Sequence, residues 1–139
     1  MTTEPTPRFV DASLRRADKA LRAAKRLLED GEPEDAVSRA YYAMFHAARA
    51  VLFQKGVIAK THRGVHTMFG LHIVKAGLLS KEFGDLLSDA FDMRQTSDYE
   101  IFAEFESEAV SELVNNAERF IKKIKELLKR WGTEGGWGE

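Results

Sequence analysis

The sequence predicts an all-α protein, an up-and-down antiparallel bundle of four to five helices. Apolar residues recur at helical spacing through most of the chain, and no segment alternates as a half-buried strand would. Proline is confined to positions 5, 7 and 33, so no helix beyond residue 33 is interrupted by one. Glycines end the periodic segments and leave only short connections, which favours antiparallel neighbours.

The composition is that of an ordinary globular protein. The 139 residues fit one domain, with 44% hydrophobic and 31% charged side chains. The chain has no cysteine, which excludes disulfides, thiolate nucleophiles and cysteine zinc sites and suits a reducing cytoplasm. Neither a signal peptide nor a run of the roughly 20 apolar residues that span a membrane is visible. We therefore expect a cytoplasmic protein without a membrane partner.

The first two helices are expected at residues 11–30 and 34–55, after a flexible N-terminal segment of residues 1–10. Gly31 stands where a helix commonly ends in a left-handed conformation, and Pro33 can open the second helix because its missing N–H costs nothing there. The second helix is the most apolar, so it is predicted to lie at the centre of the bundle.

Two shorter helices should follow. Thr61 can cap a third helix that Gly77 ends, and Ser80 can cap a fourth. Helical spacing predicts which residues of the fourth helix face inward: Phe83, Leu86, Leu87, Ala90 and Phe91.

The last helix is expected to begin at Ser97, because Ser97 and Glu100 have the spacing of a capping box. A long apolar seam follows, and it comprises Phe102, Phe105, Ala109, Leu113, Ala117, Phe120, Ile124, Leu127 and Trp131. The helical domain is thus predicted to span residues 11–131, and the Gly-rich residues 132–139 to form a flexible tail.

Charge is unevenly distributed, although the net charge is only −1. Residues 14–27 and 119–130 each carry six basic side chains, whereas residues 100–118 carry six glutamates and no base. Two interpretations remain open. The basic segments are either solvated helix faces or stripes that guide a phosphate backbone toward a site.

Arg94 is the first candidate functional residue. It continues the apolar face of the fourth helix, so its guanidinium is expected to face other helices or a partner chain. A buried guanidinium must meet an anion, because leaving it unpaired away from water is costly. That anion is either structural, such as a glutamate, or the phosphate of a ligand.

Polar residues follow Arg94. Gln95, Asp98 and Tyr99 stand beside the expected start of the last helix, and a helix N-terminus next to an arginine is an anion site. Ser97 can simply be the cap of that helix, and Asp98 can be the cap or pair with Arg94. Tyr99 places a hydroxyl next to the arginine.

Two pairs of rings are further candidates. Of Tyr41 and Tyr42, one ring is expected in the core and the other in a cleft or an interface, on the face that carries His46. His62 and His66 lie four residues apart, as metal-binding histidines can. No carboxylate motif accompanies them, so no metal site is predicted.

Three motifs, taken in order, resemble the HEPN domain. They are the run Ala40-Tyr41-Tyr42-Ala43-Met44-Phe45, then Thr61-His62-Arg63-Gly64, then Arg94 with Asp98-Tyr99 before a long terminal helix. The chain is most similar to the small, stand-alone prokaryotic branch of that family, over residues 11–130. The resemblance implies a bundle of four or five helices that forms a two-fold homodimer.

The resemblance also implies a function. Many HEPN domains are metal-independent endoribonucleases that use an arginine and a histidine four to six residues after it, without a cofactor. Stand-alone members are often the toxin of a toxin–antitoxin pair and are encoded beside a small nucleotidyltransferase. In some such pairs this partner adenylylates a tyrosine near the motif.

Carried onto this sequence, the motif arginine is Arg94 and the polar residue after it is Gln95. The motif histidine is absent and Tyr99 occupies its position, although a tyrosine, with a pKa of about 10, is a poorer acid–base group at neutral pH. The resemblance makes Arg94, Asp98 and Tyr99 the candidate catalytic residues. It makes Arg94, Gln95 and Tyr42 the candidate substrate-binding residues, and Tyr99 a nucleotidylation acceptor.

Two functions are therefore predicted. The first is a toxin–antitoxin component that acts on RNA, either as a metal-independent endoribonuclease or as a degenerate relative of one, paired with a small nucleotidyltransferase. The alternative is a non-catalytic dimeric interaction module that binds a nucleotidyltransferase partner or a nucleotide. In both, a second copy of the chain is expected to cover the end that carries Arg94.

Overall fold

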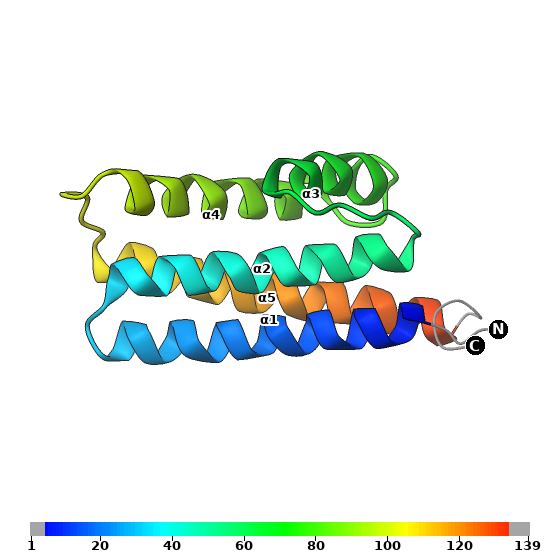
Figure 1. The fold of residues 1–139 in the computed structure, drawn as a ribbon, viewed down its shortest axis with the longest axis horizontal. Coiled ribbons are helices and arrows are strands. Elements are labelled where there is room, and N and C mark those ends of the chain that lie inside the picture. The colour runs from blue at the N-terminus through cyan, green and yellow to red at the C-terminus, as the bar shows by residue number, and fades with distance from the viewer. Residues whose placement is uncertain (1–4, 134–139) are drawn as a thin grey trace.

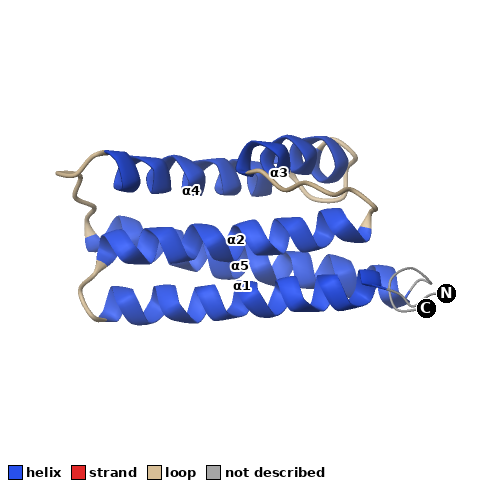
Figure 2. Ribbon diagram, in the orientation of Figure 1, coloured by secondary structure: helices blue, strands red, loops and turns tan. Residues whose placement is uncertain are grey.

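The computed structural model describes residues 5–133, which form helices joined by short loops and contain no strand (Figure 2). The helices are α1 (Pro5–Glu29), α2 (Pro33–Gln54), α3 (His62–Phe69), which continues into the π-helical turn η1 (Gly70–Val74), α4 (Lys81–Tyr99) and α5 (Ser107–Thr133). Figure 1 shows α1, α2 and α5 side by side, with α3 and α4 forming a layer over α2. The predicted all-α bundle is confirmed.

The second helix, α2, lies at the centre, as its apolar sequence predicted. It contacts α1, α3, α4 and α5. Its buried side chains occupy more than one face, and the largest of them are Tyr41, Met44, Phe45, Val51 and Leu52. Because burial of apolar surface contributes roughly 25 cal/mol per Å², these contacts fix α3 and α4 against α2. The candidate site lies where those three helices meet.

The first helix begins earlier than the expected 11–30 helix, at Pro5. Prolines are tolerated in a first helical turn because its N–H groups have no intrahelical partner. Packing holds this added segment in place, since Val10 is fully buried and the ring of Phe9 stacks on that of Phe53, with centroids 4.1 Å apart. Residues expected to be a flexible segment are therefore helical from Pro5 onward.

Three helix ends agree with the sequence signals. Gly31, Gly56 and Gly77 all have positive φ, between 80° and 84°, the left-handed conformation that glycine adopts without a steric cost. The hydroxyl of Thr61 accepts a hydrogen bond of 2.9 Å from the backbone N–H of Gly64, which caps α3. This cap fixes the first turn of α3, which carries one of the candidate histidines.

The boundary between the last two helices was predicted wrongly. The helix α4 runs through Ser97 to Tyr99, and α5 begins only at Ser107. Ser97 is therefore inside the last turn of α4 and is not a cap, since the N–H of Glu100 still bonds to the carbonyl oxygen of Thr96 at 3.0 Å. No proline or glycine interrupts this stretch, so the helix continues until the backbone becomes extended at Glu100.

The segment between α4 and α5 changes the expected seam of the last helix. Phe102 lies in it and is 92% exposed, and Ala109 is also exposed, whereas Val110 is buried in its place. The backbone N–H of Phe105 reaches the carboxylate of Glu34 on α2 at 3.4 Å. From Leu113 onward the seam is as predicted; its buried members are Leu113, Ala117, Phe120, Ile124 and Leu127.

The start of α1 and the end of α5 lie at one end of the bundle, and the α4–α5 connection lies at the opposite end (Figure 1). Of the Gly-rich segment 132–139, only Gly132 and Thr133 are described, and both belong to α5. Residues 1–4 and 134–139 lie outside the described residues, so the expected flexible tail stays a prediction.

Candidate functional site

Arg94 projects from α4 toward α2, the sheltered position that its helical phase predicted. Its side chain is 21% exposed. The guanidinium carbon lies 4.8 Å from the ring centroid of Tyr42 and 5.7 Å from that of Tyr41. Two aromatic faces therefore hold the cation by cation–π attraction, and they fix its direction as well as its charge.

Arg94 forms an ion pair with Asp98, one turn later on α4. The Nε atom of Arg94 lies 3.2 Å from a carboxylate oxygen of Asp98, which confirms one of the two roles that the sequence left open for Asp98. This contact is an ion pair without a hydrogen bond, and Nε is buried with no hydrogen-bond partner. Because Nε is closed to solvent and faces Asp98, while the side chain as a whole is 21% exposed, a ligand oxygen has to approach the guanidinium at an N–H other than that of Nε.

A hydrogen-bonded centre of Tyr41, His62 and His66 lies beside the arginine. The hydroxyl of Tyr41, which is fully buried, is 2.9 Å from Nδ1 of His62 and 3.0 Å from Nε2 of His66. A phenol has a single O–H proton, so it donates to one histidine and accepts an N–H from the other. The two imidazoles therefore play opposite roles in this centre.

All three groups of the centre are neutral near pH 7. Burial raises the pKa of Tyr41 above its usual range, and the nearby charge of Arg94 only partly offsets this. Burial lowers the pKa of His62, and Arg94 lowers it further. Burial and His62 lower the pKa of His66, with Asp92 acting in the opposite direction. Neutral imidazoles can accept protons, which imidazolium ions cannot.

Aromatic rings enclose the centre on two sides. The ring of Phe45 lies 4.6 Å from that of His62, and the ring of Phe91 lies 4.8 Å from that of His66. These contacts restrict the orientation of both imidazoles. The histidine pair, whose spacing alone could suit a metal, directs one nitrogen from each ring to the Tyr41 hydroxyl. Among residues 5–133 no group of three or more potential metal ligands occurs.

Tyr99 does not join this cluster. It ends α4 with a side chain that is 82% exposed, and Gln95 is exposed as well. Arg94 and Tyr99 are five residues apart on one helix, which turns their side chains about 140° away from each other. The anion site expected at a helix N-terminus after Arg94 is wrong, since these residues form the C-terminal turn of α4.

A basic groove adjoins the site between α1 and α2. It encloses about 680 Å³ and is lined by Arg16, Lys19, Ala20, Ala23, Arg39, Tyr42 and His46. The pKa of His46 is lowered to about 4, first by burial and then by the charges of Arg16, Arg49 and Arg39. Tyr42 lies between this groove and Arg94.

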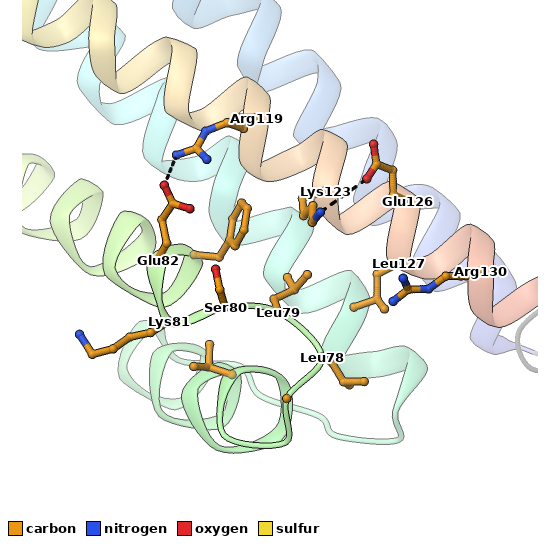
Figure 3. Close-up of a pocket in the computed structure, with 13 residues that line it drawn as sticks. Leu78, Leu79, Ser80, Lys81, Glu82, Arg119, Lys123, Glu126, Leu127 and Arg130 are labelled. Carbon is orange, nitrogen blue, oxygen red and sulfur yellow. Dashed lines mark hydrogen bonds and ion pairs between the residues drawn. The ribbon is translucent and has the colours of Figure 1, made fainter.

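A second hollow lies where the start of α4 meets α5 (Figure 3). It is larger, about 830 Å³, and also contains basic side chains. Arg119 is hydrogen bonded to Glu82 at 2.7 Å, and Lys123 lies 3.9 Å from Glu126 (Figure 3). Ser80, at the start of α4, makes no capping hydrogen bond. Arg94 does not line this pocket.

Residues 10–127 match the model of the HEPN domain. The chain belongs to the HEPN family. A protein named "Putative toxin MJ0605" from Methanocaldococcus jannaschii is 39% identical over 120 residues, which cover 86% of this chain and 89% of the relative. A second protein of that organism, named "Putative toxin MJ0142", is 32% identical over 87% of this chain and 82% of its own length. A "UPF0332 protein" from Thermotoga maritima is 38% identical over 83% and 87% of the two chains.

This HEPN chain contains functional candidates that the sequence did not bring together. Tyr41 was considered with Tyr42, and His62 with His66, but the hydrogen bonds between the two pairs join residues more than twenty positions apart. The available signal was the Thr61-His62-Arg63-Gly64 run, which supported the resemblance without suggesting a contact with Tyr41. None of the helices in the described part of the chain is both long and apolar enough to span a membrane.

Proposed function

We propose that this HEPN protein is the toxin of a toxin–antitoxin pair and cleaves RNA as a metal-independent endoribonuclease. The observation that carries the proposal is the sheltered but partly exposed guanidinium of Arg94, which lies against the ring of Tyr42 and stands beside a neutral histidine centre. The relatives named as toxins support the biological role. Arg94 supplies the positive charge that phosphoryl transfer requires, and His62 supplies the proton acceptor that the motif lacks.

In the proposed reaction, Arg94 binds a non-bridging oxygen of the scissile phosphate and stabilises the charge that develops there. His62 takes the proton of the ribose 2′-hydroxyl while the 2′ oxygen bonds to phosphorus. The bond from phosphorus to the 5′ oxygen breaks, and that oxygen takes a proton from water. His62 then returns its proton to the hydroxide. The products are a 2′,3′-cyclic phosphate and a free 5′-hydroxyl.

Tyr41 orients His62 for this role. When the Tyr41 oxygen accepts the Nδ1 proton of His62, the lone pair of the neutral imidazole is on Nε2. The hydroxyl of Tyr41 then donates its hydrogen bond to Nε2 of His66. Tyr41 is in this scheme a positioning residue, because it fixes the tautomer of His62 and does not itself contact the substrate.

The test is cleavage of labelled single-stranded RNA by the purified protein in the presence of EDTA. Arg94→Ala and His62→Gln are each expected to slow cleavage about 100-fold, because each removes a group that acts in the transition state. Arg119→Ala is the matched control and should cleave as the wild type does. Circular dichroism and melting curves establish that each variant is folded. Absence of cleavage by the wild type, or unchanged cleavage by Arg94→Ala, contradicts the proposal.

The proposed partner is a small nucleotidyltransferase that modifies Tyr99. The exposed hydroxyl of Tyr99 is accessible to an enzyme that transfers a nucleotidyl group from ATP with release of pyrophosphate. Mass spectrometry of the protein after incubation with the co-encoded nucleotidyltransferase and ATP should reveal one added nucleotidyl group. The group should be absent from Tyr99→Phe and present on Tyr42→Phe. Modification at a different residue would remove Tyr99 from this role.

A non-catalytic dimeric interaction module is the second candidate function. One observation favours it: Tyr99, Ile101 and Phe102 are 82%, 89% and 92% exposed and adjoin one another in the chain. Exposed apolar side chains gathered in this way commonly mark protein contacts. Light scattering should show a dimer that Phe102→Asp dissociates. A dimer or a partner complex without RNA cleavage by the wild type would favour this function over the first.

A further inference from the structure

The basic side chains of the groove between α1 and α2 have no carboxylate opposite them. Arg16, Lys19 and Arg39 form no ion pair within residues 5–133, whereas other bases of α1 do. Arg15 pairs with Asp11, and Lys25 lies 3.1 Å from Glu118. The bases on one face of α1 are therefore in ion pairs, whereas those on the face that lines the groove are not. The charge of the groove face is available for an external anion.

His46 lines the groove beside basic side chains. Its imidazole is half-buried there, and the charges of Arg16, Arg39 and Arg49 all oppose its protonation. Arg16 comes from α1 and Arg39 from α2, and both line the groove, so their charges face one space. A groove whose walls share one sign of charge raises the local concentration of polyanions.

The ring of Tyr42 connects the groove with the candidate site. It lines the groove, and the guanidinium carbon of Arg39 lies 5.7 Å from its centroid. On the same ring, the guanidinium carbon of Arg94 lies 4.8 Å from the centroid. A strand in the groove is thereby led to the guanidinium that the proposed reaction requires.

We propose that this groove is the binding site for the phosphodiester backbone of single-stranded RNA, and that it delivers the strand to Arg94. The choice of RNA rests on the proposed function. Arginines that alternate with the rings of Tyr42 and His46 suit a nucleic acid better than an acidic peptide, because bases stack on aromatic rings while the cations contact phosphates. Charge alone would serve either polymer.

The test compares two double variants with the same change in net charge. Arg16→Gln/Arg39→Gln removes two charges from the groove, and Arg119→Gln/Lys123→Gln removes two from the pocket in Figure 3. Fluorescence anisotropy with a labelled oligouridylate at low salt measures the dissociation constant. The groove variant should bind about 10-fold more weakly than the wild type, and the pocket variant within about twofold of it. Melting curves establish that both variants are folded.

Equal weakening in both variants, or unchanged binding by the groove variant, overturns the proposal. Displacement of the RNA by polyglutamate of the same length and charge overturns the assignment to nucleic acid. In the wild type, the nuclear magnetic resonance signals of the His46 ring should shift on addition of the oligonucleotide, and unshifted signals contradict the proposal. Groove-dependent binding without cleavage contradicts the ribonuclease function and leaves the groove intact. RNA cleavage that is equally fast in the wild type and in the groove variant supports the ribonuclease function and contradicts the role of the groove.

Discussion

The groove between α1 and α2 and the pocket between α4 and α5 are both hollows with basic walls, yet their charges face different neighbours. In the pocket, Arg119 and Lys123 meet Glu82 and Glu126. In the groove, Arg16 and Arg39 take part in no ion pair with any residue that the structure describes. Residues 14–27 and 119–130 contain equal numbers of basic residues, so the sequence count alone does not predict which stretch has bases that are free to bind a ligand. The carboxylates that lie near each base, on the same helix or on a neighbouring one, decide which charges remain available to a ligand.

The largest expected effect concerns the salt dependence of RNA binding. Each contact with a phosphate of a single strand contributes about 0.7 to the slope of log affinity against log salt, so Arg16→Gln/Arg39→Gln should reduce that slope by about 1.4. Arg119→Gln/Lys123→Gln should leave the slope unchanged, since those cations are already neutralised within the chain. Anisotropy titrations between 50 and 200 mM salt, a range of roughly fourfold, measure both slopes. Identical slopes in the two variants would contradict the conclusion that the bases of the groove, unlike those of the pocket, are available to RNA.

A smaller effect tests the buried centre next to the groove. Tyr41→Phe should lower the free energy of unfolding by about 1–3 kcal/mol, because it leaves polar nitrogens of His62 and His66 without their partner. Arg119→Ala, which breaks an exposed ion pair of the pocket, should change stability little. Urea denaturation measures both. A stability unchanged by Tyr41→Phe would mean that the hydroxyl contributes nothing to the fold.

The next prediction converts the pocket toward the groove. Glu82→Gln/Glu126→Gln removes the two acids that face the pocket bases, so this variant should bind the oligouridylate several-fold more tightly than the wild type. The gain should be smaller than the loss caused by the groove variant, because the one aromatic ring that lines the pocket, that of Phe83, is already in contact with Arg119, whose guanidinium carbon lies 5.5 Å from its centroid. Glu29→Gln/Asp30→Asn, which changes two exposed acids that do not line the pocket, is the control for net charge. An equal gain in this control would assign the effect to overall charge.

The smallest expected effect is a pH dependence caused by His46. Its pKa falls from 6.5 in the unfolded chain to about 4 in the fold, so the unfolded state binds the proton first as the pH decreases. Its contribution to stability is thus complete above pH 6.5 and is lost progressively toward pH 4. His62 and His66 act in the same direction. Stability measured from pH 7 to 5 should decline less steeply in His46→Gln, and an unchanged decline would contradict the assignment.

Most of the fold followed from the sequence because helical periodicity and glycine positions are local signals. Gly31, Gly56 and Gly77 each have the conformation that ends a helix. The α4–α5 boundary failed because Ser97 and Glu100 have the spacing of a capping box but lie where α4 ends. The spacing of a capping box does not start a new helix where the preceding helix can continue, and no proline or glycine ends α4 before Ser97.

The candidate site was only partly predictable, for a similar reason. Arg94 was found because its helical phase is also a local property. The contact of Tyr41 with His62 and His66 depends on how α3 packs against α2, which spacing along one helix does not reveal. The pairing of Arg119 with Glu82 likewise depends on which helices meet, because the two residues lie on α5 and α4. The catalytic role of Arg94 and the modification of Tyr99 stay predictions.

The direction of the chain through the bundle has a practical consequence for partners. Because α1 starts and α5 finishes at the same end, a fusion protein or a surface anchor attached through either terminus is placed far from the α4–α5 connection (Figure 1). Ile101 and Phe102, which are exposed on that connection, then lie at the end of the bundle away from the support. Protein that is immobilised through either terminus therefore leaves the α4–α5 connection accessible to a binding partner in solution.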